Sequence, residues 1–251
     1  IGYTLCFVLL NIVFILGLKY GVNGYIYSLL ISNLLFGLIS FIIILNVVSV
    51  NFNKNNMYKA LKFSWPFIPH DISNIILRSF DVLFVSQYIS FEMTGKYSLA
   101  WRVVSIIEIL LVSFNNTWNP IFMRLAIYSK MKAKLIISKI TTVYFIGLTS
   151  IILFVSAFSK QIILIIANDE YIEAELFIAI LSVGLLFKGG YFLTTQHLIF
   201  KKRMRALPIA TITSSLVFLF INMAFGKLFT AADFSIIKVG SSFLLFIIIY
   251  I

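Results

Sequence analysis

The chain has little of what a metal-dependent or nucleotide-dependent enzyme needs. Its 251 residues include a single cysteine, so an internal disulfide is excluded. The sequence has no HExxH motif, no paired cysteines and no phosphate-binding glycine loop, and its two histidines are isolated. These absences predict no metal, no cofactor and no ATP hydrolysis by this chain.

Charge is also scarce, at 12% of residues, whereas 61% are hydrophobic and the mean hydropathy is +1.04. This composition is typical of a protein that crosses a membrane several times. The apolar runs lack the period-two alternation of a membrane β-barrel, so they predict helices. We expect eight spans, at about 2–18, 24–49, 65–89, 97–124, 135–158, 174–200, 207–226 and 236–251.

Basic residues are distributed unevenly between the connections. Twelve lie in the alternate connections 50–62, 124–139 and 201–205, whereas the other connections carry four lysines and most of the acids. The positive-inside rule therefore places the first set in the cytoplasm. The run KKRMR at 201–205 is interpreted as a topology determinant and not as a nucleic-acid patch, and the acidic stretch 169–175 as an exposed outer loop.

Six ionisable residues interrupt the predicted spans: Asp71, Arg78, Asp81, Arg102, Glu108 and Lys188. A charge near the bilayer centre costs roughly 2.5–3.5 kcal/mol on insertion scales. Such residues usually line a polar path or pair with each other. The set therefore indicates a membrane protein that handles a charged or polar cargo.

The segment 63–88 combines helix-breaking prolines with three of these charges. Pro66 and Pro69 lie in the first turns of the predicted span, where they bend or unwind a helix. Asp71 and Arg78 are seven residues apart and so share a helix face, and Asp81 is within hydrogen-bonding reach of Arg78. An internal salt bridge and a face lining a transport cavity both remain open.

The later spans hold the remaining charges. Lys188 is followed by Gly189 and Gly190, and it either pairs with an acid across the bundle or faces an anion. Glu108 lies in the middle of its span. Arg102 lies nearer the outer surface, where its side chain either snorkels to the headgroups or contacts cargo.

Several blocks of sequence carry a family resemblance. They are LKFSWPFIPHDIS (61–73), SFDVLFVSQY (79–88), TGKYSLAWRV (94–103) and NPIFMRL (119–125), followed by Tyr171 with Ala174, KKRMR, and Asn222 with Gly226. In order and spacing the chain resembles the polysaccharide-biosynthesis flippases, the O-antigen and capsule repeat-unit transporters of the multidrug/oligosaccharidyl-lipid/polysaccharide exporter superfamily.

The resemblance implies an all-α, polytopic membrane bundle with the MATE-like two-lobe transporter fold. Residues 1–50 would be the last two helices of the first lobe, and residues 51–64 a cytoplasmic linker that forms an interfacial helix. Residues 65–251 would be about six helices of the second lobe. Because the chain begins at Ile1 and stops inside an apolar run, we expect it to be a piece of a longer protein.

The resemblance also implies a function. Such proteins move an undecaprenyl-pyrophosphate-linked oligosaccharide across the bacterial cytoplasmic membrane by alternating access, coupled to an H⁺ or Na⁺ gradient. Their partners are membrane lipids, a polysaccharide polymerase and a chain-length regulator, not nucleic acid. The resemblance implies substrate binding for Arg78 and Lys188. From their placement inside the spans we expect substrate binding for Arg102, ion coupling for Asp71, Asp81 and Glu108, and hinges at Pro66, Pro69, Gly189 and Gly190.

Two other functions stay open at this point. A MATE-type multidrug or organic-cation antiporter would need acids left unpaired in its cavity, whereas here bases accompany the acids. A membrane glycan polymerase or ligase would need a long external loop, and the predicted loops are short. The balance of acids and bases also predicts that this part of the transporter lacks a net positive cavity.

Overall fold

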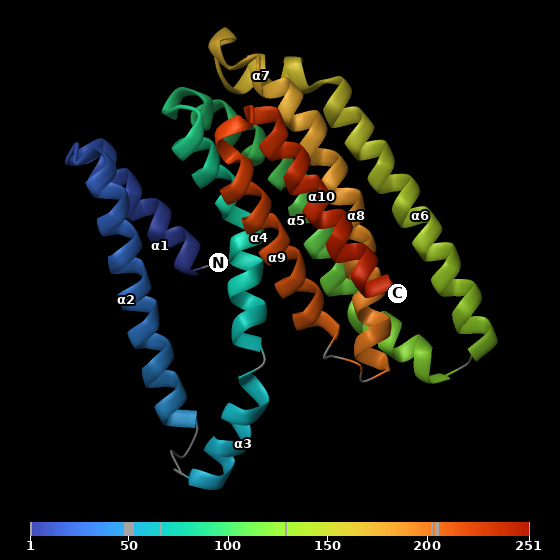
Figure 1. Ribbon diagram of the computed structural model, residues 1–251. Helices are drawn as coiled ribbons and strands as arrows, with labels where there is room; N and C mark the ends of the chain where they lie inside the picture. Colours follow the sequence, from blue (N-terminus) through green and yellow to red (C-terminus); the bar gives the residue numbers. More distant parts are fainter. Residues whose placement is uncertain are drawn as a thin grey trace. The chain divides into compact units, whose positions relative to one another are not determined.

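The computed structural model describes residues 2–47, 53–65, 67–128, 130–201, 203 and 206–250. These residues form helices and contain no strand (Figure 1). The α-helices are α1 (Gly2–Asn11), α2 (Gly21–Val47), α3 (Lys54–Ser64), α4 (Phe67–Tyr88), α5 (Phe91–Tyr128), α6 (Lys130–Ala157), α7 (Ser159–Ile166), α8 (Ala174–Phe200), α9 (Ala206–Phe225) and α10 (Ala231–Tyr250). The π-helix η1 (Ile12–Gly17) extends α1, and the 3₁₀ turns η2 (Asp169–Tyr171) and η3 (Gly226–Leu228) precede α8 and α10.

The prediction of an all-α, multi-pass membrane protein is confirmed. In the part of the chain that is described, α2, α5, α6, α8, α9 and α10 are long and apolar enough to cross a bilayer. The helix α4 is not in this set although it has 22 residues, because its charged residues lower its hydropathy. The region of α1 and η1 is a shorter apolar helix. The count of eight spans stays a prediction.

The chain divides into two compact units, residues 1–61 and 62–251. In the first unit, α2 buries a small-residue stripe of Gly24, Ser28 and Ser32. A Cβ at Gly24 would lie 3.0 Å from the backbone of Phe14 in η1. The missing side chain therefore lets α2 and η1 approach closely. Most other side chains of α2 are apolar and exposed, as expected for a lipid-facing helix.

A short helix forms within the predicted connection 51–64. Asn53 accepts hydrogen bonds at its side-chain oxygen from the backbone N–H groups of Asn55, at 2.9 Å, and Asn56, at 3.3 Å. This is the capping that asparagine provides at a helix start, and α3 begins directly after it. Its location at a membrane interface and the division of the chain into two lobes remain predictions.

The second unit has its core where α4, α5, α8, α9 and α10 meet. The largest fully buried side chains there include Tyr97, Phe218 and Phe234. Glycines allow α8 and α10 to pack closely, since a Cβ at Gly184 would lie 3.3 Å from Val239 and one at Gly190 would lie 2.7 Å from the ring of Phe246. Small residues at helix contacts are the usual means of tight packing in a membrane.

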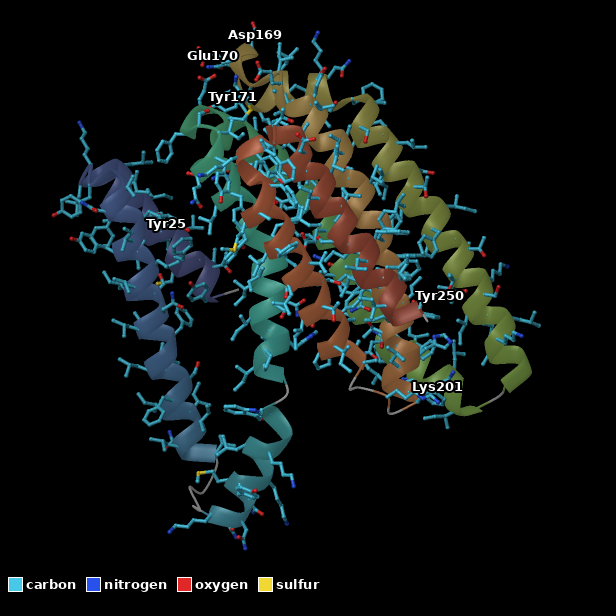
Figure 2. All side chains as sticks on the ribbon, in the orientation of Figure 1. Tyr25, Asp169, Glu170, Tyr171, Lys201 and Tyr250 are labelled. Carbon is cyan, nitrogen blue, oxygen red and sulfur yellow. The ribbon has the colours of Figure 1, made fainter. Side chains whose placement is uncertain are left out.

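The helices of the second unit run alternately up and down. The connections α5–α6 and α8–α9 lie at one end, and α4–α5, α9–α10 and the η2 region lie at the other (Figure 1). Figure 2 shows Lys201 at the first end and Asp169 and Glu170 at the second. The basic and acidic connections therefore separate as the positive-inside rule requires, although Lys202 and Arg205 lie outside the described residues.

The predicted hinges do not interrupt the described helices. Pro66 lies outside the described residues, and Pro69 is the third residue of α4, where a proline costs no hydrogen bond. The helix α8 continues through Gly189 and Gly190. A Cβ at Gly189 would lie 2.8 Å from the hydroxyl of Tyr144, so in this conformation the two glycines serve packing. Hinge motion stays a prediction.

Candidate functional site

A polar cavity lies between α4, α5, α8 and α10. Its volume is about 380 Å³. The charged side chains of this region, Arg78, Asp81, Glu108, Lys188 and Lys238, each lie within four residues of the middle of their helices, which is about 6 Å along the helix axis. The bundle therefore places five charges near the depth of the bilayer centre, where they carry their largest cost.

The lining of this central cavity has an excess of positive charge. Arg78, Lys188 and Lys238 line it, and Glu108 is the one carboxylate among the described lining residues. The sequence-based prediction of a balanced cavity is therefore wrong for this conformation. Asp81 and Asp71 are not part of the lining, and Lys238 adds a cation that the prediction omitted.

Lys238 on α10 is fixed by three partners. Its ammonium lies 3.0 Å from Oδ1 of Asp81, donates to the backbone carbonyl of Arg78 at 2.9 Å, and lies 4.6 Å from the ring centroid of Trp101. The hydroxyl of Tyr97 donates to the other carboxylate oxygen of Asp81 at 2.8 Å. This cluster ties α4, α5 and α10 together in the middle of the unit.

Lys188 on α8 pairs with Glu108 on α5, with the ammonium 2.5 Å from Oε1. The side chains of this pair are 30% and 12% exposed, whereas those of Lys238 and Asp81 are 9% and 1% exposed. The Lys188–Glu108 pair therefore faces the cavity, where a cargo can reach it. The Lys238–Asp81 pair is closed off by protein on nearly every side.

Arg78 lines the central cavity from α4 and keeps its guanidinium available. The internal salt bridge with Asp81, one of the two alternatives left open by the sequence, is not formed, because the Asp81 carboxylate contacts Lys238 and Tyr97 instead. No ion pair joins Arg78 to a carboxylate within the described ranges. The guanidinium therefore remains a potential donor to an anion in the cavity.

One end of the central cavity is lined by uncharged polar groups. His70 and Asn74 on α4 line it, and their side chains are joined by a 3.1 Å hydrogen bond. The other ring nitrogen of His70 lies 2.8 Å from the hydroxyl of Thr211 on α9. This chain of hydrogen bonds links α4 to α9 and gives both ring nitrogens of His70 a partner.

Two of the predicted site residues lie apart from the central cavity. Arg102 lines a separate polar cavity of about 400 Å³ with Gly95, Asn168 and Tyr171, at the end of the acidic connection. Asp71 is exposed and is not part of the central lining. The structure therefore brings Arg78, Lys188 and Glu108 together at the central cavity. Asp81 lies next to this group through its ion pair with Lys238. Roles for Arg102 and Asp71 remain predictions.

The sequence contained a signal for Lys238 that the prediction did not use. It is a lysine inside the apolar run that became α10, and so it meets the same criterion as Lys188. It lies only two residues inside the predicted span 236–251, near what looked like a helix end. The observed helix begins at Ala231, and this moves Lys238 toward the middle.

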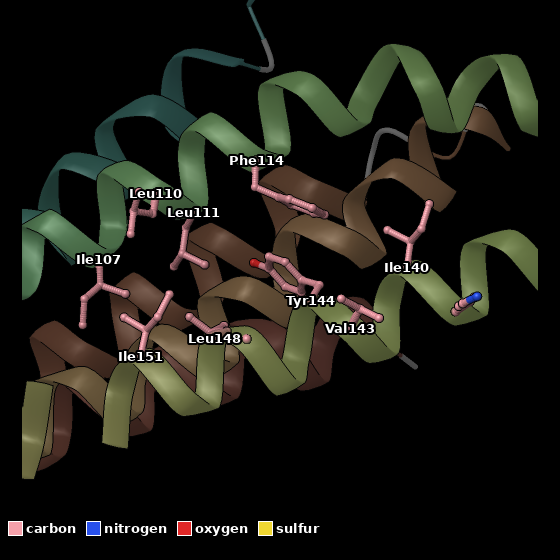
Figure 3. Close-up of a pocket in the computed structure, with 11 residues that line it drawn as sticks. Ile107, Leu110, Leu111, Phe114, Ile140, Val143, Tyr144, Leu148 and Ile151 are labelled. Carbon is pink, nitrogen blue, oxygen red and sulfur yellow. The ribbon is translucent and has the colours of Figure 1, made fainter. Parts of the chain in front are cut away.

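A third cavity is apolar and lies between α5 and α6 (Figure 3). It has a volume of about 460 Å³. Leu111, Phe114, Tyr144 and Leu148 contribute to its lining, and Lys139 is its one charged residue within the described chain. An apolar lining offers few partners to a charged or sugar group. The central cavity therefore remains the candidate site for polar cargo.

Comparison with known proteins gives one match. The family model described as "Polysaccharide biosynthesis protein" matches residues 2–126. No curated protein and no solved structure matches the chain. The matched region includes Arg78, Asp81 and Glu108 and ends before Lys188 and Lys238. Through residues 2–126, the chain belongs to the polysaccharide biosynthesis protein family.

Proposed function

We propose that the protein is a flippase for a lipid-linked oligosaccharide in the bacterial cytoplasmic membrane. The cargo would be an undecaprenyl-pyrophosphate-linked repeat unit of a surface polysaccharide. Family membership supports a role in polysaccharide synthesis or export, and six apolar helices support a multi-pass membrane protein. Transport is the step of such a pathway for which a membrane bundle with a central polar cavity is suited.

The observation that carries the proposal is the charge of the central cavity. Three cations and one carboxylate line it. Lys188 and Lys238 are paired with acids, but Arg78 has no carboxylate partner among the described residues, at a depth where unpaired charge is most costly. An anionic group entering the cavity would complete the hydrogen bonds of Arg78 and Lys188. Charge-assisted hydrogen bonds of this kind contribute about 1.5–3 kcal/mol each. A pyrophosphate or an acidic sugar has the required chemistry.

Glu108 would act as an internal counter-ion for Lys188. With the cavity empty, the Glu108 carboxylate satisfies the ammonium. When an anion of the cargo binds Lys188, Glu108 loses its partner in a site of low polarity, and this favours uptake of a proton or a sodium ion. Replacement of Glu108 by the cargo anion as the partner of Lys188 would therefore couple cargo movement to an H⁺ or Na⁺ gradient. Alternating access around the fixed site would complete the cycle.

The acids give less support to a MATE-type cation antiporter. An organic cation needs a carboxylate that is free to receive it, but Glu108 is engaged by Lys188 and Asp81 by Lys238 and Tyr97. The cations that line the cavity would also repel a positive drug. We therefore place the flippase first. A polysaccharide polymerase and a chain-length regulator would receive its product on the outer face.

Arg78 offers a direct test of this function. Replacing Arg78 with glutamine should lower surface-polymer assembly at least tenfold, since one charge-assisted interaction of about 1.5–3 kcal/mol is lost. Arg78→Lys should retain part of the activity. The readout is the amount of surface glycan in cells whose chromosomal copy carries the change.

Arg124→Gln is the matched control, because Arg124 is exposed near the end of α5 and lines none of the three cavities above. It should leave surface glycan at the wild-type amount. Normal assembly in the Arg78→Gln strain, with equal protein in the membrane, would remove Arg78 from the cargo site.

A further inference from the structure

A fourth cavity lies at the basic end of the second unit, and its lining combines several aromatic side chains with two cations and no carboxylate among the described residues. It has a volume of about 560 Å³. Trp118 and Phe122 on α5, Phe145 on α6 and Phe246 on α10 contribute to its walls, and Lys201 and Arg203 lie at the end near the α8–α9 connection. Figure 2 shows Lys201 at that end of the unit.

The basic mouth is held by the backbone of the connection. The N–H of Arg203 donates to the carbonyl of Leu198 at 2.9 Å, and the N–H of Ala206 donates to the carbonyl of Arg203 at 3.3 Å. These bonds fix Arg203 at the cavity beside Lys201. His197, whose ring lies 4.8 Å from that of Phe122, connects the basic mouth to the aromatic wall.

The length of the cavity matches one leaflet of a membrane. Along α8 it reaches from Lys201 to Gly190, a distance of about 16 Å at 1.5 Å per residue. The hydrocarbon core of a bilayer is roughly 30 Å thick, so one leaflet contributes about half of that. The cavity therefore begins at the predicted cytoplasmic surface and ends near the bilayer centre.

The inner end of this cavity lies back to back with the central cavity. On α8, Gly190 and Leu193 line the aromatic cavity, whereas Lys188 and Tyr191 line the central one. On α10, the adjacent residues Leu245 and Phe246 divide in the same way. A ligand held here would therefore have its apolar chain beside the helices that carry the Lys188–Glu108 and Lys238–Asp81 pairs.

We propose that this aromatic cavity binds the polyprenyl-phosphate end of the lipid-linked cargo in the cytoplasmic leaflet, before the cargo enters the central cavity. The phosphates would contact Lys201 and Arg203, and the first isoprene units would lie against the aromatic walls. This site rests on the proposed function, because it assigns that function's cargo a first binding position.

The test uses the full-length protein in nanodiscs of a neutral phospholipid, with labelled geranylgeranyl diphosphate as the probe. Lys201→Ala combined with Arg203→Ala should weaken binding roughly tenfold or more, because each cation near a membrane surface contributes about a factor of five. Lys160→Ala is the matched control, since Lys160 is an exposed lysine at the opposite end, and it should bind as the wild type does.

Thr194→Phe gives an independent variant that fills the cavity from α8 and leaves the charges in place. It should also weaken binding, with the helical circular dichroism unchanged. Equal binding by the wild type and the double alanine variant would overturn the proposal. If inorganic diphosphate competes as well as unlabelled geranylgeranyl diphosphate, the apolar walls contribute nothing to binding. If phosphatidylglycerol competes equally well, the cavity is a site for anionic lipids in general. Either result overturns the proposal.

Binding and transport are measured separately, so the two proposals can fail separately. If the probe does not bind at this cavity but Arg78→Gln still stops polymer assembly, the flippase remains and its first contact lies elsewhere. If the probe binds as expected but cells lacking the gene assemble normal polymer, the binding site remains and the flippase function is wrong.

Discussion

Replacing Lys238 with methionine should lower the free energy of unfolding by about 3 kcal/mol or more. The change leaves the Asp81 carboxylate, which is 1% exposed, without its counter-ion, and breaking a buried pair from one side costs about 3–5 kcal/mol. It also removes the donor to the Arg78 carbonyl. Denaturation of the purified protein in mixed micelles, followed by circular dichroism, measures the loss.

A second variant separates the lost charge pair from the lost packing. Lys238→Met combined with Asp81→Asn removes both charges and keeps a partner for Tyr97, so it should recover most of the stability. Lys160→Met, at an exposed lysine, should change stability by less than about 0.5 kcal/mol. If Lys238→Met were as stable as the wild type, the central cluster would not hold α4, α5 and α10 together.

Replacing Lys188 with methionine should reduce cargo translocation by at least tenfold, and Glu108→Gln should act differently. The Lys188→Met variant would lose an interaction with an anionic cargo that contributes about 1.5–3 kcal/mol. Glu108→Gln should keep the cargo contact but remove the group that takes up the coupling ion. Translocation by that variant should therefore no longer respond to an imposed pH or sodium gradient. Proteoliposomes loaded with lipid-linked oligosaccharide give both measurements.

The double variant Lys188→Met/Glu108→Gln tests whether these effects come from folding. Because it removes both members of the pair, it should be more stable than Lys188→Met alone while still failing to transport. Recovery of transport in the double variant would mean that Lys188 serves only to neutralise Glu108. A gradient response that survives in Glu108→Gln would move the coupling site to another acid.

Much of the fold could be predicted because apolar runs of about 20 residues have few alternatives in a membrane. The predicted span 174–200 coincides with α8, Ala174–Phe200, and the predicted span 207–226 differs from α9 by one residue at each end. The short helix α7 was not predicted, because Ser159, Lys160 and Gln161 were assigned to a connection and the five apolar residues that follow them are too few to suggest a span.

The partners in the candidate site could not be predicted from spacing alone. Asp81 is three residues after Arg78, a separation that allows contact on one helix, yet its side chain points to α10 and α5 instead. Spacing within a helix gives the face of a residue but not which neighbouring helix covers that face. The pairing of Lys188 with an acid across the bundle was one of two alternatives, and only the packing of α5 against α8 selects Glu108.

The most direct test of the account is the location of lipid-linked oligosaccharide in cells without the full-length gene. The flippase function predicts loss of surface glycan, with lipid-linked repeat units accumulating on the cytoplasmic face of the membrane and restored by the wild-type gene. Unchanged surface glycan together with new sensitivity to cationic drugs would contradict the account and favour the antiporter.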